Sequence, residues 1–400
     1  MKPSLSRRAF LRDSAMFAGS AGTLAGALAG APWLAQAAPL AGRATADAPV
    51  MINANEYPDG PSAAALKAIA EIAPQGGRYQ WALQMEFLQT IAQQLGVGMD
   101  HLMAYAGSTE PLDYTILAFT SPQAALVTAD PTYEAGWRAA ARNGAQVIKL
   151  PLRQDDSHDV QAMCAADPKA GVIYICNPNN PTGSVTARAD LEYALAHKPK
   201  GSVLVVDEAY IHFYDGAASA VDMVAAGEDV VVLRTFSKLY GMAGIRLGYA
   251  VARPDLLQKL KFYSVNSLPV TAVAAGLASL RDPQLVPRRR AATAAIRTDT
   301  IAFLEGQGYR CTRAQSNCFM VDVKRPAKGF MDDMATHGVF VGRSWEVWPN
   351  ASRITVGTAA EMARFKQAFV EVAAGRRGPL PVPSPGMALY DPMNRFFRCA

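Results

Sequence analysis

A lysine and an arginine that follow the same hydrophobic run indicate chemistry at a reactive amine. Lys238 lies shortly after the run Val230–Leu233, and Arg246 follows eight residues later, past Gly241 and Gly244. A lysine is a weak nucleophile at its ordinary pKa, so a protein that uses one to form a Schiff base must desolvate it or place cations nearby. The spacing predicts a reactive amine beside an anion site. The alternative is a surface lysine in a glycine-rich loop.

Two further segments place polar side chains directly after apolar runs. Asn180 lies in the proline-flanked turn 177–183, which presents its amide from a rigid loop. Asp207 ends a fully apolar run, and Tyr210 follows three residues later. A buried carboxylate at position 207 is costly unless it has a cationic partner. These residues predict a polar site at the ends of two strands.

A third pair of segments contains hydroxyl groups and an aromatic ring. Ser108 and Thr109 precede the helix-like segment 111–119, so hydroxyls and backbone amides are available for a phosphate there. A simple helix N-cap is the alternative. Tyr133 follows another strand-like run, where packing in the core is the default interpretation.

The elements that would position these residues alternate between strands and helices. Alternation of this kind predicts a mostly parallel sheet with helices on both faces, and ligands bind at the carboxyl ends of such strands. The predicted strands are 124–128, 146–150, 171–176, 202–206, 230–233 and 247–252, and clear helical patterns cover 83–95, 134–143 and 187–197. Residues 288–369 have the pattern of a smaller α+β part.

Composition indicates a globular chain with a large core. The chain has 400 residues, half of them apolar, which predicts two domains or one large domain with a satellite. Five scattered cysteines, none with zinc-site spacing, predict mostly free and buried thiols and no metal site.

The N-terminus has the pattern of an export signal. Arg7 and Arg8 precede an Ala/Gly-rich run, and the small-x-small sequence 35–37 follows it. This resembles a twin-arginine signal, with a membrane anchor or a basic amphipathic segment as the alternative. Cleavage after residue 37 removes four basic residues and one acidic residue, so the net charge falls from +5 to +2. The mature chain is therefore predicted to bind neither nucleic acid nor, stably, a membrane.

Taken together, these segments supply the groups that pyridoxal phosphate requires: a lysine, a carboxylate, amide and phenol donors, a stacking ring and a phosphate site. Over about residues 50–372 the chain resembles the fold-type I aminotransferases, within them the histidinol-phosphate aminotransferase-like branch. The resemblance rests on the ordered motifs INANEYPDGP, RYQW, AGSTE, DPTYE, NPNNPTG, VVDEAY, TFSKLYGMAGIRLG and SRITVGT. It implies a large domain with a mostly parallel seven-stranded sheet flanked by helices, plus a smaller α+β domain. The expected divisions are a cleaved signal (1–37), an N-terminal arm (38–61), the large cofactor-binding domain (62–285), the small domain (286–374) and a proline-rich tail (375–400).

The resemblance also implies roles for the cofactor residues. Lys238 would be the Schiff-base lysine and later the base that moves the substrate proton. Asp207 would keep the pyridine nitrogen protonated, Asn180 and Tyr210 would bind the phenolic oxygen, and Tyr133 would stack on the ring. The phosphate would be held by Ser108, Thr109, Thr235, Ser237 and Arg246. Tyr79 matches the position that reaches the neighbouring subunit's phosphate, which implies a homodimer.

Substrate recognition is expected near the C-terminal motifs and the arm. Arg353 resembles the arginine that pairs with the substrate carboxylate, and Arg343 matches an arginine position of the phosphate-recognising branch. Surface ion pairs are the alternative for both. Trp345 and Trp348 lie between them, and packing under the small domain is slightly favoured over a contact with substrate. Asn55 and Tyr57, or the intervening glutamate, are expected to cover the site.

The predicted activity is transfer of an amino group between an amino acid or related amine and a 2-oxo acid. A lyase, decarboxylase or racemase reaction on the same cofactor and a non-catalytic cofactor-binding or ligand-binding module are the alternatives. Because histidinol phosphate is made in the cytoplasm, an exported chain is expected to be a paralogue with another donor. It would be carried folded by the twin-arginine translocase and would work in the periplasm.

Overall fold

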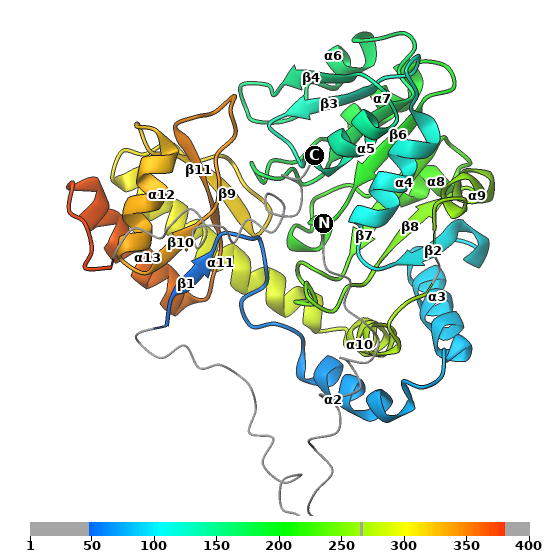
Figure 1. Cartoon of the computed structure of the whole chain (residues 1–400), viewed down its shortest axis with the longest axis horizontal. Coiled ribbons are helices and arrows are strands. Elements are labelled where there is room, and N and C mark those ends of the chain that lie inside the picture. The colour runs from blue at the N-terminus through cyan, green and yellow to red at the C-terminus, as the bar shows by residue number, and fades with distance from the viewer. Residues whose placement is uncertain (1–47, 265–266, 381–400) are drawn as a thin grey trace, which may run out of the picture. The chain divides into compact units, whose positions relative to one another are not determined.

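The computed structural model describes residues 48–264 and 267–380. The predicted export signal and its cleavage site lie outside the described residues, as do the first residues of the arm and residues 381–400 of the predicted tail (Figure 1). No helix in the described ranges is long and apolar enough to cross a membrane.

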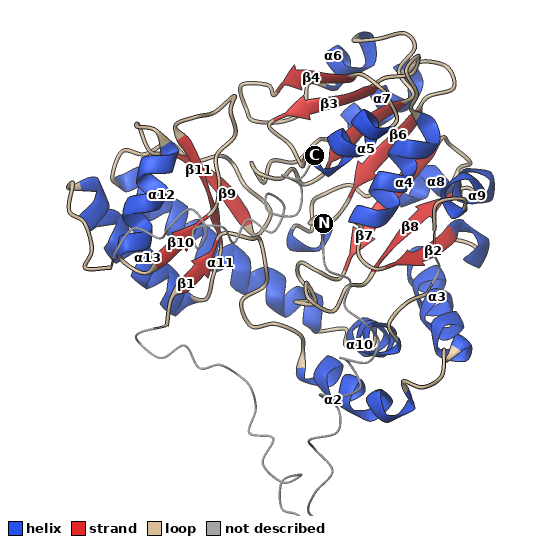
Figure 2. Cartoon of the chain, viewed as in Figure 1, coloured by secondary structure: helices blue, strands red, loops and turns tan. Residues whose placement is uncertain are grey.

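A seven-stranded sheet lies at the centre of the larger part of the fold (Figure 2). Its strands are β2 (Leu102–Tyr105), β3 (Leu126–Asp130), β4 (Val147–Pro151), β5 (Val172–Cys176), β6 (Val203–Asp207), β7 (Val230–Thr235) and β8 (Gly248–Ala252). They are arranged in the order β2-β8-β7-β6-β5-β3-β4. The five strands from β7 to β4 pair in parallel, while β8 is antiparallel to both of its neighbours. The predicted fold class is confirmed.

The central strands are buried on both faces because nearly every residue in them is apolar. Successive side chains of a strand point to opposite faces. Accordingly, Leu204 and Val206 of β6 belong to one hydrophobic cluster, while Val203 and Val205 belong to the other. Parallel strands covered on both faces have this kind of continuous apolar sequence.

Helices cover each face of the sheet (Figure 1). Residues of α4 (Thr109–Phe119), α5 (Ala135–Arg142) and α9 (Pro254–Lys261) pack in one cluster. Residues of α3 (Trp81–Leu95), α6 (Val160–Ala165), α7 (Arg188–His197), α8 (Val221–Ala225) and α10 (Val270–Leu280) pack in the other, and Ala65 of α2 (Ala63–Ile72) joins them. Three short 3-10 helices are η3 (Ala73–Gln75), η4 (Met99–His101) and η5 (Ile211–Phe213).

The smaller part has a hydrophobic core of its own. It consists of β1 (Val50–Ile52), β9 (Cys318–Asp322), β10 (Val339–Val341), β11 (Ala351–Thr355), α11 (Leu285–Gly306), α12 (Ala327–Thr336) and α13 (Ala359–Ala373). β9 and β11 pair antiparallel, and β1 pairs parallel with β10. A capping box starts α13, in which Thr358 accepts from the Glu361 amide and the Glu361 carboxylate accepts from the Thr358 amide.

Every strand predicted from an apolar run is present, with ends displaced by at most two residues. Five of the eleven strands in the described residues had no predicted range, and three of them, β9, β10 and β11, lie in the part predicted only as α+β. β1 has only three residues and lies in the segment predicted to be an arm, where Val50 and Ile52 are buried against the smaller part. β2 (LMAY) contains no β-branched residue. Four of the five cysteines are free and buried, as predicted, and Cys399 lies outside the described residues.

Candidate active site

Lys238, Asp207 and Asn180 lie at or shortly after the carboxyl ends of three adjacent parallel strands, β7, β6 and β5. Asp207 is the last residue of β6 and is 2% exposed. Its carboxylate accepts from the Tyr174 hydroxyl at 3.0 Å and from the Ala209 amide at 3.1 Å. Desolvation raises the pKa of Asp207 to about 6, although these two donors oppose the rise. The sheet thus presents a buried acid beside the loop that carries the lysine.

The Lys238 amine lies in surroundings that disfavour its charged form. Desolvation, followed by the positive charge of Arg353, lowers the pKa of Lys238 from 10.5 to about 8. The Nζ atom is 5.5 Å from the centre of the Tyr210 ring. With a pKa near 8, about one amine in ten is neutral at pH 7, against fewer than one in a thousand at the ordinary value. This is the environment that the sequence predicted for a reactive amine.

The side-chain amide of Asn55 links the arm to both parts of the fold. Its Nδ2 donates to the Tyr210 hydroxyl at 3.0 Å, to Asn180 Oδ1 at 3.4 Å and to Cys318 Sγ at 3.2 Å. Its own Oδ1 accepts from the Thr355 hydroxyl at 3.0 Å. Asn55 has a φ of 54° and is 1% exposed, so this position holds a left-handed backbone conformation in the centre of the site.

Arg353 lies on β11 and reaches across to the larger part. Its Nη1 donates to Asn180 Oδ1 at 3.0 Å and its Nη2 donates to the Asn53 carbonyl at 2.6 Å. Asn180 Oδ1 accepts from Arg353 Nη1 and from Asn55 Nδ2, so the Nδ2 group of Asn180 can donate to another acceptor. A guanidinium at this point, 8% exposed, presents a fork that suits a carboxylate.

The predicted phosphate residues lie where β7, β8 and α4 meet. The Thr235 hydroxyl donates to Ser237 Oγ at 2.9 Å, and Arg246 Nη1 donates to the same Oγ at 3.1 Å. Arg246 Nη2 donates to the Ala106 carbonyl at 3.0 Å. Gly107 has a φ of +98°, and a Cβ atom there would lie 2.3 Å from Arg246 Nη2, so only glycine lets the guanidinium approach this closely.

The start of α4 completes this end of the site. Ser108 is the N-cap residue of α4, and its side chain makes no capping hydrogen bond within the described part of the chain. Thr109 Oγ1 lies 3.1 Å from the Tyr133 hydroxyl. Hydroxyls at a helix N-terminus, with an arginine nearby, are the groups that bind a phosphate.

Three predicted site residues have their main side-chain contacts with other residues, although the Arg343 carbonyl accepts from the Arg353 amide at 3.1 Å. The Arg289 guanidinium carbon lies 4.2 Å from the centre of the Tyr57 ring. Tyr79 is 69% exposed and stacks on Trp81 at 5.2 Å. Arg343 forms an ion pair with Glu134 and stacks on Trp345 at 4.3 Å.

Sequence reasoning missed Tyr174, Cys318 and Glu134. Tyr174 lies inside an apolar strand and Cys318 begins β9, so neither stands in a recognisable motif. Glu134 directly follows the predicted ring residue Tyr133, and its partner is 209 positions away. For Tyr174 the sequence did contain a signal, because parallel register pairs β5 with β6 and places a tyrosine near the acid that ends β6.

Comparisons with known proteins identify the family. Residues 49–369 match the family model described as aminotransferase class I and II. This chain belongs to the class I and II aminotransferases. A histidinol-phosphate aminotransferase of Symbiobacterium thermophilum is 35% identical, covering 80% of this chain and 89% of its own. An aromatic amino acid aminotransferase of Cutibacterium acnes is 32% identical over 82% of this chain and 93% of its own.

A solved structure of this family is similar over most of the aminotransferase. The histidinol-phosphate aminotransferase of Sinorhizobium meliloti, solved in complex with pyridoxal-5'-phosphate, has a TM-score of 0.76 and 25% identity. The match covers 81% of this chain and 90% of that one. The family and this neighbour confirm the predicted cofactor, pyridoxal phosphate, and the predicted class of activity, a pyridoxal-phosphate-dependent aminotransferase.

The residues of the aminotransferase fit this cofactor. The buried Asp207 carboxyl, whose pKa is held near 6 by desolvation, is suited to a cationic ring N–H, which would lower that pKa again. Because Gly107 has no side chain, the Arg246 guanidinium lies close to the backbone and to the hydroxyls at the start of α4. This arrangement of a cation, hydroxyls and a helix N-terminus suits a phosphate. Lys238 lies between Asp207 and Arg246 in the sequence and has the lowered pKa that carbonyl chemistry needs.

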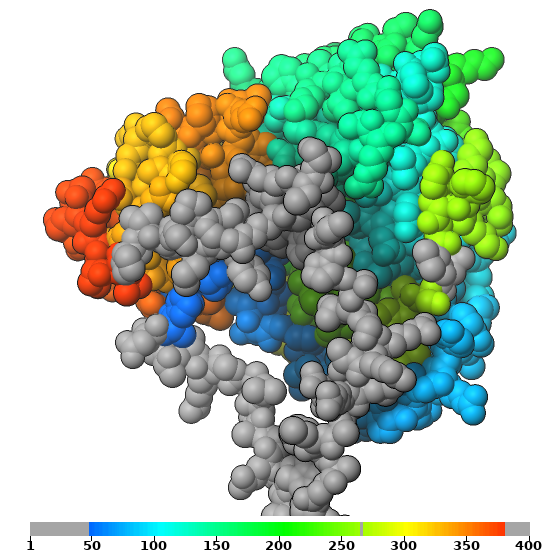
Figure 3. Space-filling view, viewed as in Figure 1, coloured from blue at the N-terminus to red at the C-terminus, as the bar shows by residue number. Residues whose placement is uncertain are grey.

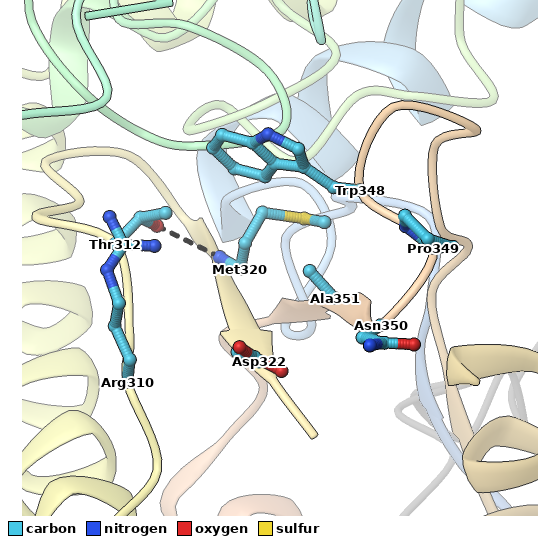
Figure 4. A pocket seen from close by; sticks show the side chains of 8 residues that line it. All are labelled: Arg310, Thr312, Met320, Asp322, Trp348, Pro349, Asn350 and Ala351. Carbon is cyan, nitrogen blue, oxygen red and sulfur yellow. Dashed lines mark hydrogen bonds between the residues drawn. The ribbon is translucent and has the colours of Figure 1, made fainter. Parts of the chain in front are cut away.

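Two pockets in the described part of the chain are lined by residues other than those of the candidate site. One, of about 200 Å³, is lined by Arg310, Thr312, Met320, Asp322, Trp348, Pro349, Asn350 and Ala351, and in Figure 4 the Trp348 indole lies over the Met320 side chain. The other, of about 410 Å³, is lined by Gln154, Asp155, Asp156, Glu305, Arg310, Cys311 and Arg313. Among the residues that the structure describes, no group of three or more His, Cys, Asp or Glu side chains is arranged to hold a metal ion.

Proposed function

We propose that this aminotransferase moves an amino group between an amino acid or related amine and a 2-oxo acid, and that Lys238 is its catalytic base. The observation that carries the proposal is the lowered pKa of the Lys238 amine, about 8, beside Tyr210 and the acid Asp207. An amine that is partly neutral at physiological pH can take up a proton and return it.

Each end of the site has a separate task. Pyridoxal phosphate, when bound, supplies the carbonyl carbon that takes up the amino group and a ring that accepts electrons. Asp207 would keep a proton on the ring nitrogen, and the Asn180 Nδ2 and Tyr210 hydroxyl would bind the phenolic oxygen. The phosphate would be held by Ser108, Thr109, Thr235, Ser237 and Arg246, and Tyr133 would stack on the ring. These are the roles that the family resemblance implies, and positions at the carboxyl ends of the strands and around the start of α4 support them.

Proton transfer falls to Lys238. Its Nζ, 5.5 Å from the centre of the Tyr210 ring and partly neutral at physiological pH, would take the proton from the substrate α-carbon, hold it and return it. Arg353 binds the donor's carboxylate through its two terminal nitrogens, and Asn55 holds Asn180 and Tyr210 in place. Water is excluded by the burial of Asn55, Asn180 and Tyr210, which are at most 5% exposed.

A panel of amino acids added to the purified, cofactor-loaded protein tests the activity. Conversion of the bound cofactor to its amino form, with release of a 2-oxo acid, is the expected result. Release of CO2 or ammonia without that conversion would indicate a lyase or decarboxylase, and no spectral change with any amine would indicate a binding module. Either result would overturn the proposal.

A donor other than histidinol phosphate and a periplasmic location are proposed together. The chain is a histidinol-phosphate aminotransferase-like paralogue whose export signal, with Arg7 and Arg8, directs it folded through the twin-arginine translocase to the periplasm. Export of the folded chain is compatible with loading of the cofactor before transport. Expression with the signal should give a shortened, yellow protein in the periplasm. Colourless periplasmic protein, or only uncleaved protein in the cytoplasm, would count against this location.

A homodimer is proposed from exposed aromatic residues near the start of α3. Tyr79 and Trp81 are 69% and 57% exposed and stack on each other, and Met85 one turn later is 53% exposed. Part of the blue segments α2 and α3 lies at the surface in Figure 3. A patch of this kind favours burial against a second copy, from which Tyr79 would reach the neighbouring phosphate. Sedimentation of the wild type and of Trp81→Glu tests this, and a wild type that is monomeric at micromolar concentration would refute it.

A further inference from the structure

The Arg343 guanidinium is engaged by an acid from the other part of the fold. Its Nη2 donates to Glu134 Oε2, and the side chains of this pair are 28% and 33% exposed. Glu134 lies between Tyr133 and the first turn of α5, as the N-cap residue of that helix. A negative charge is favourable at a helix N-terminus, so this position suits the carboxylate independently of Arg343.

Arg343 and the proposed substrate arginine lie on the same indole ring. The guanidinium carbons of Arg343 and Arg353 are 4.3 Å and 5.7 Å from the centre of the Trp345 ring. The Arg353 amide also donates to the Arg343 carbonyl at 3.1 Å. Arg343 therefore borders the site that would receive the donor's carboxylate. A second anionic group on the donor would meet it there.

Trp345 is fixed in this position. It is 3% exposed, its Nε1 donates to the Thr132 carbonyl at 3.2 Å, and it packs with Met320 and Ala351. Thr132 and Glu134 flank the proposed stacking residue Tyr133. The indole and the ion pair thus join the same short segment of the larger part to the loop between β10 and β11.

We propose that Glu134 is a specificity-determining residue, which holds Arg343 so that this site selects amino donors without a distal phosphate or carboxylate. The proposal rests on the amino-transfer function proposed above. A distal anion would have to separate Arg343 from Glu134 and would then face the Glu134 carboxylate, a like charge. A neutral donor side chain meets neither obstacle. Glu134 acts through Arg343, as a positioning residue.

Glu134→Gln tests the proposal because it keeps the side-chain size and removes the charge. The ratio of kcat/KM for O-phospho-L-serine to that for L-leucine should rise roughly fivefold, the effect of a partly exposed ion pair. The same ratio for L-aspartate to L-leucine should rise with it. Inorganic phosphate, titrated calorimetrically into protein loaded with pyridoxal phosphate, should bind roughly fivefold more tightly to the variant than to the wild type.

Two comparisons isolate the ion pair. Glu346→Gln removes the same charge from the exposed loop residue beside Trp345 and should leave both readouts within roughly twofold of the wild type. The double variant Glu134→Gln/Arg343→Gln should lose the gain, since the arginine that binds the anion is gone. An unchanged ratio and phosphate affinity in Glu134→Gln, or an equal gain in Glu346→Gln, would overturn the proposal.

The titration also separates this inference from the proposed activity. If the wild type transfers no amino group from any donor, the proposed function fails, while the phosphate affinities of the two single variants still support or overturn the role of Glu134. If transfer is observed and the wild type already prefers O-phospho-L-serine or L-aspartate to L-leucine, the function stands and the inference fails.

Discussion

Asp207→Asn should stabilise the protein when pyridoxal phosphate has been removed. The carboxyl is 2% exposed, and desolvation raises its pKa from 3.8 to about 6. Because the folded pKa lies above the unfolded one, the folded protein binds the extra proton between these values. Stability contributed by that proton is fully present below about pH 3.8 and is lost as the pH rises through about 6.

The size of the effect follows from the pKa difference. A rise of about two units corresponds to ~3 kcal/mol of unfolding free energy lost between low pH and pH 8. Asparagine has nearly the same shape and no charge. Its side-chain oxygen can still accept a hydrogen bond from the Ala209 amide, and its side-chain NH2 can donate to the Tyr174 hydroxyl oxygen. The cofactor-free variant should therefore melt about 4 °C above the wild type at pH 8, and the gap should close toward pH 4.

Differential scanning calorimetry of cofactor-free protein between pH 4 and pH 8 measures this. Asp113→Asn is a matched comparison, because desolvation also raises the pKa of Asp113 to about 6, although Arg142 lies 4.0 Å away. Both variants should flatten the pH dependence of stability. Only Asp207→Asn should also weaken pyridoxal phosphate binding, since only Asp207 is assigned to the ring nitrogen.

Two results would refute the reasoning about Asp207. One is a cofactor-free Asp207→Asn protein that is less stable than the wild type at pH 8, which would mean that the charged carboxylate is well solvated or paired in the folded state. The other is equal affinity of wild type and variant for pyridoxal phosphate, which would remove Asp207 from the cofactor site.

Three further substitutions test other parts of the site. Lys238→Ala should lower amino transfer roughly a thousandfold with an unchanged circular dichroism spectrum, and persistent turnover would contradict its role. Gly107→Ala places a Cβ 2.3 Å from Arg246 Nη2 and should weaken pyridoxal phosphate binding roughly tenfold. Gly201→Ala, with similar backbone strain and no atom within 4 Å, should leave that affinity unchanged in the same fluorescence titration. Arg353→Lys replaces a two-nitrogen fork by one ammonium, so the KM for amino acids should rise roughly tenfold while kcat changes less.

The larger part of the fold was predictable because its strands are buried on both faces. Continuous apolar runs such as β6 and β7 are visible in the sequence, and their ends are marked by polar residues. Asp207 is the last residue of β6 and Lys238 lies three residues after β7, and both are predicted site residues. The sequence predicted the fold and a candidate site together because ligands bind at the carboxyl ends of parallel strands.

Contacts between distant segments could not be predicted in the same way. The ion pair of Arg343 with Glu134 depends on how the loop after β10 meets the start of α5, and neither residue has a periodic pattern that reports it. β1 pairs with β10 nearly 300 positions away, and three residues are too few to show alternation. Short elements and long-range ion pairs are decided by tertiary packing, which local sequence reports poorly.

Asn55 shows how such contacts make one site from three segments. Its Nδ2 contacts Tyr210 and Asn180 of the larger part, while its Oδ1 accepts from Thr355 on β11 of the smaller part. Arg353, two residues before Thr355, donates to the same Asn180 oxygen. A carboxylate bound by Arg353 would therefore act on Asn180, and through the shared oxygen on Asn55 and the Tyr210 hydroxyl. The proposed substrate arginine and the groups assigned to the cofactor's phenolic oxygen belong to one hydrogen-bond network, so a substitution at either end should alter the hydrogen bonds at the other.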